Sequence, residues 1–249
     1  MKRKINIIIC FLVTAGFYSC NKYVNQSGTS GGGGTVTNTS DSVSYIKFFN
    51  PVDFGNLTVY LNNDSLGSIA PYFPSTYIKT KAGSNIVRIV SPVNPSIDAL
   101  NVGIDVTGGK YYSCFMYKVG YDWKISLVPD DLTAPPANKA NIRVLDFRTQ
   151  AYFTYVNISV VSPGLDQVSF YKRNFLDHST YGSNAQFKPV FAGSYNIVVT
   201  QDTSITNLAI KKNVALDNGK IYSVIMMTPT AATPAAALSQ ISLDVEKHN

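Results

Sequence analysis

Residues 82–113 (AGSNIVRIVSPVNPSIDALNVGIDVTGGKYYS) and residues 192–223 (AGSYNIVVTQDTSITNLAIKKNVALDNGKIYS) are two versions of one pattern, 110 positions apart. Each begins with Ala-Gly-Ser, continues through apolar segments and ends with Gly-Lys-x-Tyr-Ser. Met116 and Met226 keep the same offset, and 57–60 resembles 168–171 at an offset of 111. Matches in one order at nearly one spacing indicate an internal repeat, so the chain contains two tandem domains.

Each copy has the two-residue period of β-strands. The runs are short, rich in Val, Ile, Thr, Tyr and Phe, and bounded by turn residues such as Asn62-Asn63-Asp64 and Asp217-Asn218-Gly219. No amphipathic helix stands out, and the Ala-rich segment 230–238 carries Pro234, which favours a loop or hairpin crossing before a last strand at 239–245. About seven strands per copy predict an all-β chain of two tandem antiparallel β-sandwiches, Ig-like or transthyretin-like.

The domain limits follow from composition. We predict sandwiches at 43–130 and 139–249, joined by a linker over 129–139 that includes Pro135-Pro136 and Asp130. The second copy is longer near its start. Its first strand is either 140–147 or 155–161, and we favour the former, with an inserted hairpin after it.

The N-terminus has the features of a targeting signal. Lys2, Arg3 and Lys4 precede a short apolar stretch, which predicts a signal peptide over 1–19. Ser19-Cys20 resembles a bacterial lipobox, which implies lipidation of Cys20; the rival is cleavage near Ala15-Gly16 to a secreted form. The Gly/Ser/Thr-rich residues 20–42 predict a flexible tether.

Composition excludes several function classes. Without the three basic residues of the signal, the net charge falls from +6 to +3, from 18 basic and 15 acidic residues, which gives no reason to expect nucleic-acid binding. With two His and three Cys, we expect no metal site and no cofactor. Once Cys10 has left and Cys20 is lipidated, Cys114 is alone; its repeat counterpart is Val224, so we expect it in the core.

Six repeated residues are expected to have structural roles. Gly83 and Gly193 should adopt positive φ at turns, and Gly109 and Gly219 mark the turn before a strand. Tyr112 and Tyr222 occupy one strand position, where a ring can be buried and its hydroxyl bonded to a loop backbone, as in a tyrosine corner.

The sequence offers little for catalysis. His248 is next to last and expected to fray, His178 lies in a predicted polar turn, and Glu246 is the only Glu. We therefore expect no enzyme activity.

Several aromatic residues lie near predicted loops and are candidate ligand contacts: Tyr72, Phe73, Tyr121 and Trp123. Exposed rings on a sandwich can stack on sugars. The alternative, which we favour, is that these rings fill the core or seal the joint between the domains.

The order Ala-Gly-Ser, apolar strand, turn, Gly-Lys-x-Tyr-Ser, apolar strand, found twice, resembles the domain-of-unknown-function 4397 family, as does 140–144 after a Pro-containing linker. The resemblance covers about 43–246. It implies tandem β-sandwich domains in envelope lipoproteins of the Bacteroidetes type, and it implies no activity.

Together these features predict a non-catalytic cell-envelope lipoprotein. It would be held on the outer membrane through Cys20, at the periplasmic face or the cell surface, and would present two interaction domains to a protein or glycan partner. One alternative is a fimbrial subunit that exchanges strand 44–50 or 239–245. Another is a carbohydrate-binding module of a glycan-uptake system.

The lipid anchor has a direct test. Labelled palmitate should enter the unmodified protein in growing cells and should not enter Cys20→Ala, because the thioether needs that thiol. Incorporation into Cys20→Ala would overturn the assignment.

Overall fold

The computed structural model describes residues 42–51, 55–90, 98–148, 155–165, 167–203, 206–228 and 241–249. The predicted signal peptide, Cys20, the tether up to residue 41 and the segment 230–238 lie outside the described residues. Among the described residues no helix has both the length and the apolar character needed to cross a membrane.

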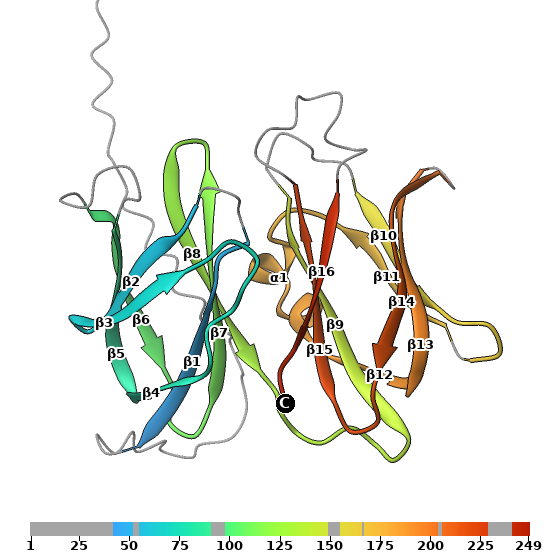
Figure 1. Ribbon diagram of the computed structural model, residues 1–249, viewed down its shortest axis with the longest axis horizontal. Helices are drawn as coiled ribbons and strands as arrows, with labels where there is room; N and C mark the ends of the chain where they lie inside the picture. The colour runs from blue at the N-terminus through green and yellow to red at the C-terminus, as the bar shows by residue number, and fades with distance from the viewer. Residues whose placement is uncertain are drawn as a thin grey trace, which may run out of the picture. The chain divides into compact units, whose positions relative to one another are not determined.

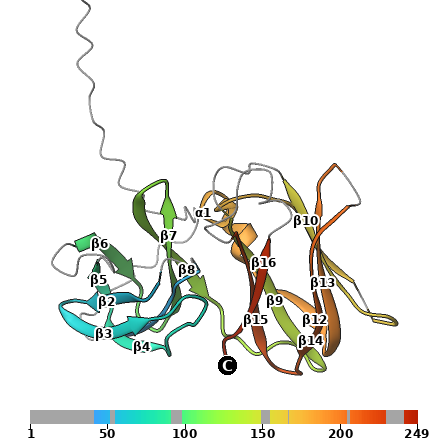
Figure 2. The same cartoon turned by 45° about the horizontal axis from the view of Figure 1, so that its top comes forward.

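The described residues form four sheets of four strands each, and two sheets make up each sandwich (Figure 1, Figure 2). This confirms the predicted all-β fold with two tandem sandwiches. Each copy contributes eight strands rather than about seven. The first sandwich contains β1 (Val43–Phe49), β2 (Leu57–Leu61), β3 (Asp64–Ile69), β4 (Ile78–Lys81), β5 (Gly83–Val90), β6 (Asp98–Val106), β7 (Tyr111–Val119) and β8 (Asp122–Asp130).

The second sandwich adds a short helical connection. Its elements are β9 (Lys139–Phe147), β10 (Val156–Val161), β11 (Val168–Arg173), α1 (Asp177–Thr180), the 3-10 turn η1 (Gly182–Ala185), β12 (Lys188–Phe191), β13 (Gly193–Gln201), β14 (Asn207–Leu216), β15 (Ile221–Met227) and β16 (Ser242–Lys247).

Both sandwiches have the same topology. The strand orders are β4-β1-β7-β8 and β3-β2-β5-β6 in the first, and β12-β9-β15-β16 and β11-β10-β13-β14 in the second. Most pairs are antiparallel, but β1 is parallel to β7 and β9 is parallel to β15. The two-residue period shows which face a side chain occupies, and it carries no information on strand partners.

The topology corrects the repeat alignment at one place. β10 occupies the place of β2, and β11 the place of β3, so the match of 57–60 with 168–171 paired the wrong strands. The favoured first strand, 140–147, corresponds to β9, and residues 156–161, which were assigned to an inserted hairpin, form β10. Strands with the same alternating pattern look alike when only four residues are compared, so a short match can align a strand with the neighbour of its true counterpart.

Each sandwich has its own apolar core. Phe48, Val59, Ile89 and Cys114 are among the fully buried residues of the first, and Val224 is buried in the second at the position of Cys114. Burial raises the pKa of the Cys114 thiol to about 12. Trp123 is only 7% exposed and belongs to the first core.

The central strands β1 and β9 are buried on both faces along most of their length. Phe48 of β1 points into the first core, while its neighbours Lys47 and Phe49 are also buried. Arg143 of β9 is fully buried as well. An isolated sandwich would leave that second face in water, so the burial of these side chains comes from contact between the two sandwiches.

Candidate functional site

The joint between the sandwiches has an apolar part. Phe49, Phe115 and Val128 of the first sandwich form one buried cluster with Leu145, Phe147, Ile225 and Met227 of the second. The rings of Phe115 and Phe147 stack with centroids 4.6 Å apart. Of the four aromatic candidates only Tyr72 packs against this cluster, and the phenylalanines that seal the joint were not singled out from the sequence.

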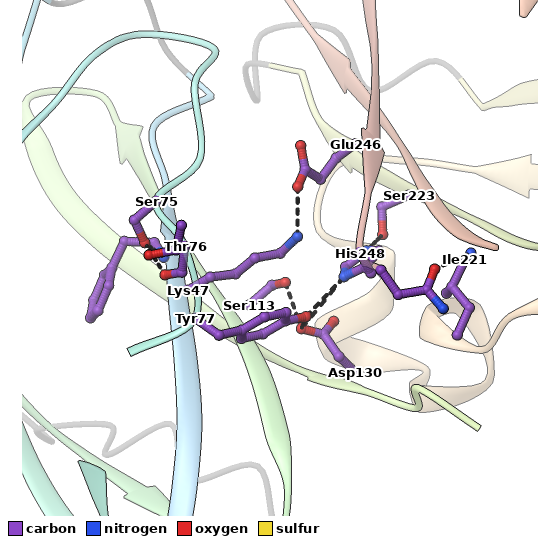
Figure 3. Close-up of polar contacts among 12 residues, drawn as sticks. Lys47, Ser75, Thr76, Tyr77, Ser113, Asp130, Ile221, Ser223, Glu246 and His248 are labelled. Atoms are coloured by element: carbon purple, nitrogen blue, oxygen red, sulfur yellow. Dashed lines mark hydrogen bonds and ion pairs between the residues drawn. The ribbon is translucent and has the colours of Figure 1, made fainter. Parts of the chain in front are cut away.

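The polar part of the joint uses equivalent positions of the two repeats. Strand register matches Lys47 with Arg143, Ser113 with Ser223, and Asp130 with His248. Figure 3 shows Lys47 directed toward Glu246, and Tyr77 and Asp130 directed toward His248, beside Ser223. The repeats therefore meet through corresponding faces, as the subunits of a two-fold symmetric dimer do.

A closed ring of hydrogen bonds crosses this joint. Arg143 donates through Nη2 to Asp130 Oδ1 and through Nε to Ser223 Oγ, 2.7 Å away. Ser223 Oγ lies 2.7 Å from His248 Nε2, His248 Nδ1 lies 3.0 Å from Tyr77 Oη, and Tyr77 donates to Asp130 Oδ2 over 2.8 Å. The ring thus starts and ends at Arg143.

The ring selects one tautomer of His248. Tyr77 has a single hydroxyl proton, which goes to Asp130, so His248 Nδ1–H must donate to Tyr77 Oη. Nε2 then accepts from the Ser223 hydroxyl. Burial lowers the pKa of His248 to about 3, although nearby Asp130 opposes this, so the imidazole is neutral at pH 7, as the ring requires.

The joint also balances its buried charges. Burial works to raise the pKa of Asp130, but Arg143 and the hydroxyls of Ser113 and Tyr77 hold it below its usual value. Lys47 Nζ lies 2.7 Å from Glu246 Oε1. Burial lowers the pKa of Lys47, and Glu246 counteracts that shift. Two cations thus face two anions in a water-poor environment, where an unpaired charge would be costly.

A second contact crosses the joint at α1. His178 Nε2 lies 3.0 Å from Ser126 Oγ of β8, and its ring lies 5.1 Å from that of Phe147. Arg173 fixes α1 through a buried pair with Asp177, at 2.5 Å. Burial lowers the pKa of His178 to about 3, with Arg173 adding to the effect.

These positions correct three expectations. His248 is not frayed: its side chain is buried and its backbone N–H donates to Ile221 O over 2.9 Å. His178 lies in a buried helix turn rather than a solvated one, and Asp130 ends β8 rather than belonging to the linker. Sequence position suggested exposure in each case, while tertiary contact between distant strands buries all three.

The contact of Ser223 with His248 and the nearby Asp130 has the residue types of a hydrolytic triad. However, His248 Nδ1 and Asp130 Oδ2 are 3.9 Å apart with Tyr77 bonded to both, and Arg143 donates to the Ser223 oxygen. Ser223 is also fully buried. A nucleophile must reach its substrate, so this geometry fits a structural role. Among the described residues, no group of three or more His, Cys, Asp or Glu could hold a metal.

The four candidate ligand contacts differ in exposure. Trp123 is in the first core, so it cannot stack on a ligand at the surface, and Tyr72 packs against the apolar cluster of the joint. Tyr121 is 98% exposed in the turn between β7 and β8, and Phe73 is 69% exposed in the connection from β3 to β4. Only Tyr121 and Phe73 of the four are strongly exposed.

The repeated tyrosines and glycines lie at turns. The hydroxyl of Tyr112 accepts from Thr107 N and that of Tyr222 from Asp217 N, each at 3.0 Å, which is the arrangement of a tyrosine corner. Gly83, Gly109 and Gly219 have φ of 98°, 75° and 74°. The expected positive φ at Gly193 is wrong, and a Cβ there would meet the end of the exposed Leu165 side chain at 2.7 Å, which can move away.

Sequence reasoning missed Tyr77, Asp130, Arg143, Ser223 and His248 as a group. One signal was present: Arg143 sits within the apolar strand 140–147, where a charge needs a buried partner. The partner could not be identified from the sequence, because Asp130 belongs to the other domain.

Removing Arg143 should be costly. Arg143→Met leaves Asp130 as an uncompensated buried charge, so the free energy of unfolding should fall by about 3–5 kcal/mol in denaturant titrations. Lys247→Met is the matched control, because its pair with Asp217 is largely exposed, and it should have little effect. Equal effects of the two substitutions would contradict a stabilising role for the ring.

The buried histidines should make stability depend on pH. Their folded pKa values are about 3, against about 6.5 for an unfolded histidine, so below pH 6.5 the unfolded state binds more protons. Each histidine should then remove about 1.4 kcal/mol of stability per pH unit as the pH falls from 6 to 4. His178→Gln should roughly halve that slope in denaturant titrations, and a flat profile over this range would refute the burial of both rings.

The chain was compared with families, curated proteins and solved structures. No curated protein matches. Its similar solved structures include a protein provisionally assigned to cell adhesion from Parabacteroides distasonis (8% identity, 83% of this chain and 98% of that chain, TM-score 0.21). Others are the fimbrial anchor protein Mfa2 from Porphyromonas gingivalis (6%, 82% and 97%, 0.24) and another protein provisionally assigned to cell adhesion, from Bacteroides fragilis (10%, 78% and 83%, 0.23). Similarity at this level supports no functional assignment.

The family comparison gives a match to the first repeat. The model of DUF4397, a domain of unknown function, matches residues 44–153, from β1 through β9. Residues 44–153 thus match a DUF4397 domain, which confirms the predicted resemblance over this part of the chain.

Proposed function

We propose that this chain is a non-catalytic cell-envelope protein, lipid-anchored at Cys20, whose far end binds a protein partner. The supporting observation is that exposed aromatic rings gather at the end of the sandwiches opposite the point where the chain enters.

The strands define two ends of the first sandwich. The proximal end holds Val43, the first residue of β1, together with Gly109, whose N–H donates to Val43 O. The distal end holds Asn50, which bridges to Pro71, and the β7–β8 turn between Val119 and Asp122. The anchor would therefore pull on the proximal end.

The second sandwich runs in the same sense. At the proximal end Asp130 contacts Arg143 and lies near His248, while farther along Phe115 stacks on Phe147, the last residue of β9. The distal ends of the two sandwiches thus lie on one side of the joint. A partner bound there could contact loops of both repeats.

Exposed aromatic rings lie at this distal end. Phe73 and Tyr121 belong to the first sandwich; Tyr155, whose carbonyl accepts from Asp202 beyond β13, and Tyr181, just after α1, belong to the second. At the proximal end the ring of Phe191 is partly covered by Lys139, with Nζ 4.7 Å from its centroid. Large aromatic side chains supply much of the binding energy in protein interfaces, so the distal end is the better docking surface.

The joint supports an interaction role rather than chemistry. Its polar groups bond to one another and are buried, so they connect the two sandwiches and leave the loops as the accessible part. The carbohydrate alternative loses one of its four candidate contacts, because Trp123 is in the core. The fimbrial alternative would need a strand to leave. β1 lies between β4 and β7, which disfavours release of strand 44–50, whereas β16, which overlaps the predicted strand 239–245, is at a sheet edge and pairs with β15.

Site-specific photo-crosslinking in cells tests the proposal. p-Benzoylphenylalanine at Tyr121 should give defined crosslinked products, because that side chain would touch the partner. The matched control is the same replacement at Ile86, which is 52% exposed and lies near the start of β5, toward the proximal end. Products from position 86 and none from position 121 would overturn the distal surface.

A further inference from the structure

We propose that the first sandwich bears tension between its anchor and its partner, with β1 and β7 loaded in shear. This inference rests on the proposed function for the direction of the load. It concerns a mechanical property of the fold, which can be measured without the lipid or the partner.

β1 is held on both sides. It pairs antiparallel with β4, from Val43 opposite Lys81 to Ile46 opposite Ile78. It also pairs parallel with β7, from Tyr45 opposite Tyr111 to Phe49 opposite Phe115. A strand enclosed by two neighbours cannot be peeled from a sheet edge, so tension on its start must act on both ladders.

The parallel pairing sets the direction of the load. An anchor attached ahead of Ser42 pulls β1 from its N-terminal end, and a partner at Tyr121 pulls β7 from its C-terminal end. In a parallel pair these two ends are at opposite ends of the sheet, so the strands are drawn past each other along their length. The hydrogen bonds between them lie across this direction and share the force, and they must break together.

Side chains reinforce β1 against sliding. Ile46 and Phe48 are fully buried in the first core. On the opposite face, Phe49 is in the apolar cluster of the joint and Lys47 pairs with Glu246. A slip by one residue would exchange these two faces and place Lys47 in the apolar core.

The start of β1, where the load enters, has further contacts. Tyr45 N–H donates to Lys110 O over 2.9 Å, and its ring stacks on Tyr111 with centroids 4.7 Å apart. Ser44 is fully buried and its hydroxyl donates to Thr107 O over 2.6 Å. The first residues of the strand are therefore fixed rather than loose.

Single-molecule force spectroscopy tests the shear geometry. The chain from residue 20 onward, carrying Cys20→Ala, is pulled between an N-terminal handle and Tyr121→Cys; Cys114 does not compete because it is buried. The control is pulled between Lys110→Cys and Asp131→Cys, exposed residues beside the Tyr111–Asp130 pair, so β7 and β8 separate one pair at a time. We expect a severalfold higher rupture force in the first geometry, and equal or lower force would overturn the proposal.

A pair of substitutions isolates the backbone contribution. Tyr45→Ala removes the ring, and Tyr45→Pro also removes the N–H that bonds to Lys110, so the proline variant should rupture at lower force than the alanine variant in the shear geometry alone. Thermal melts show whether both fold. If Tyr45→Pro does not fold, the comparison of the two pulling geometries still tests the proposal.

The outcomes separate the two proposals. Loss of the crosslink at position 121 with a strong shear response would reject the partner surface and keep the mechanical property. A crosslink at position 121 with equal rupture forces in the two pulling geometries would keep the partner surface and reject the mechanical property.

Discussion

The buried ion pair of Arg143 with Asp130 is the contact on which the arrangement of the two repeats depends. Each residue comes from a different sandwich, and neither side chain has access to water. Charges in such a place are tolerated only when they are paired and their remaining hydrogen-bonding groups are satisfied. Ser113, Tyr77, Ser223 and His248 meet that requirement, so the geometry of the whole polar joint follows from the need to satisfy one carboxylate and one guanidinium.

The joint changes the character of the sheets that form it. A sheet of a single sandwich has one face in the core and one in water, whereas strands β1 and β9 are covered on both faces along most of their length. The apolar cluster around Phe115 and Phe147 buries apolar surface. The ring of hydrogen bonds specifies how the two sandwiches are oriented, because it forms in only one register. The two sandwiches therefore present their distal loops on one side of the joint, which makes a shared docking surface geometrically reasonable.

The two repeats share a fold, but equivalent positions in the joint carry different polar side chains. Lys47 and Arg143 are equivalent cations that use different partners, Glu246 and Asp130, and the equivalent of Asp130 is the neutral His248. This divergence lets each repeat recognise the other rather than a copy of itself, since two identical faces would place carboxylate against carboxylate. The same divergence made the joint hard to predict, because a comparison of the repeats emphasises the residues that they share. Shared residues such as Tyr112 and Tyr222 stabilise turns within one sandwich and do not lie between the two.

The sequence by itself determined the all-β class, the tandem repeat and the core position of Cys114, because these depend on local period and on self-similarity along the chain. It could not determine strand partners, so the parallel pairing of β1 with β7 and the place of β10 came only with the tertiary structure. It also misplaced His178, His248 and Asp130, whose surroundings are made by residues tens to more than a hundred positions away. Burial of a polar side chain is a property of the surfaces that close over it, and those surfaces exist only once the two repeats have packed together.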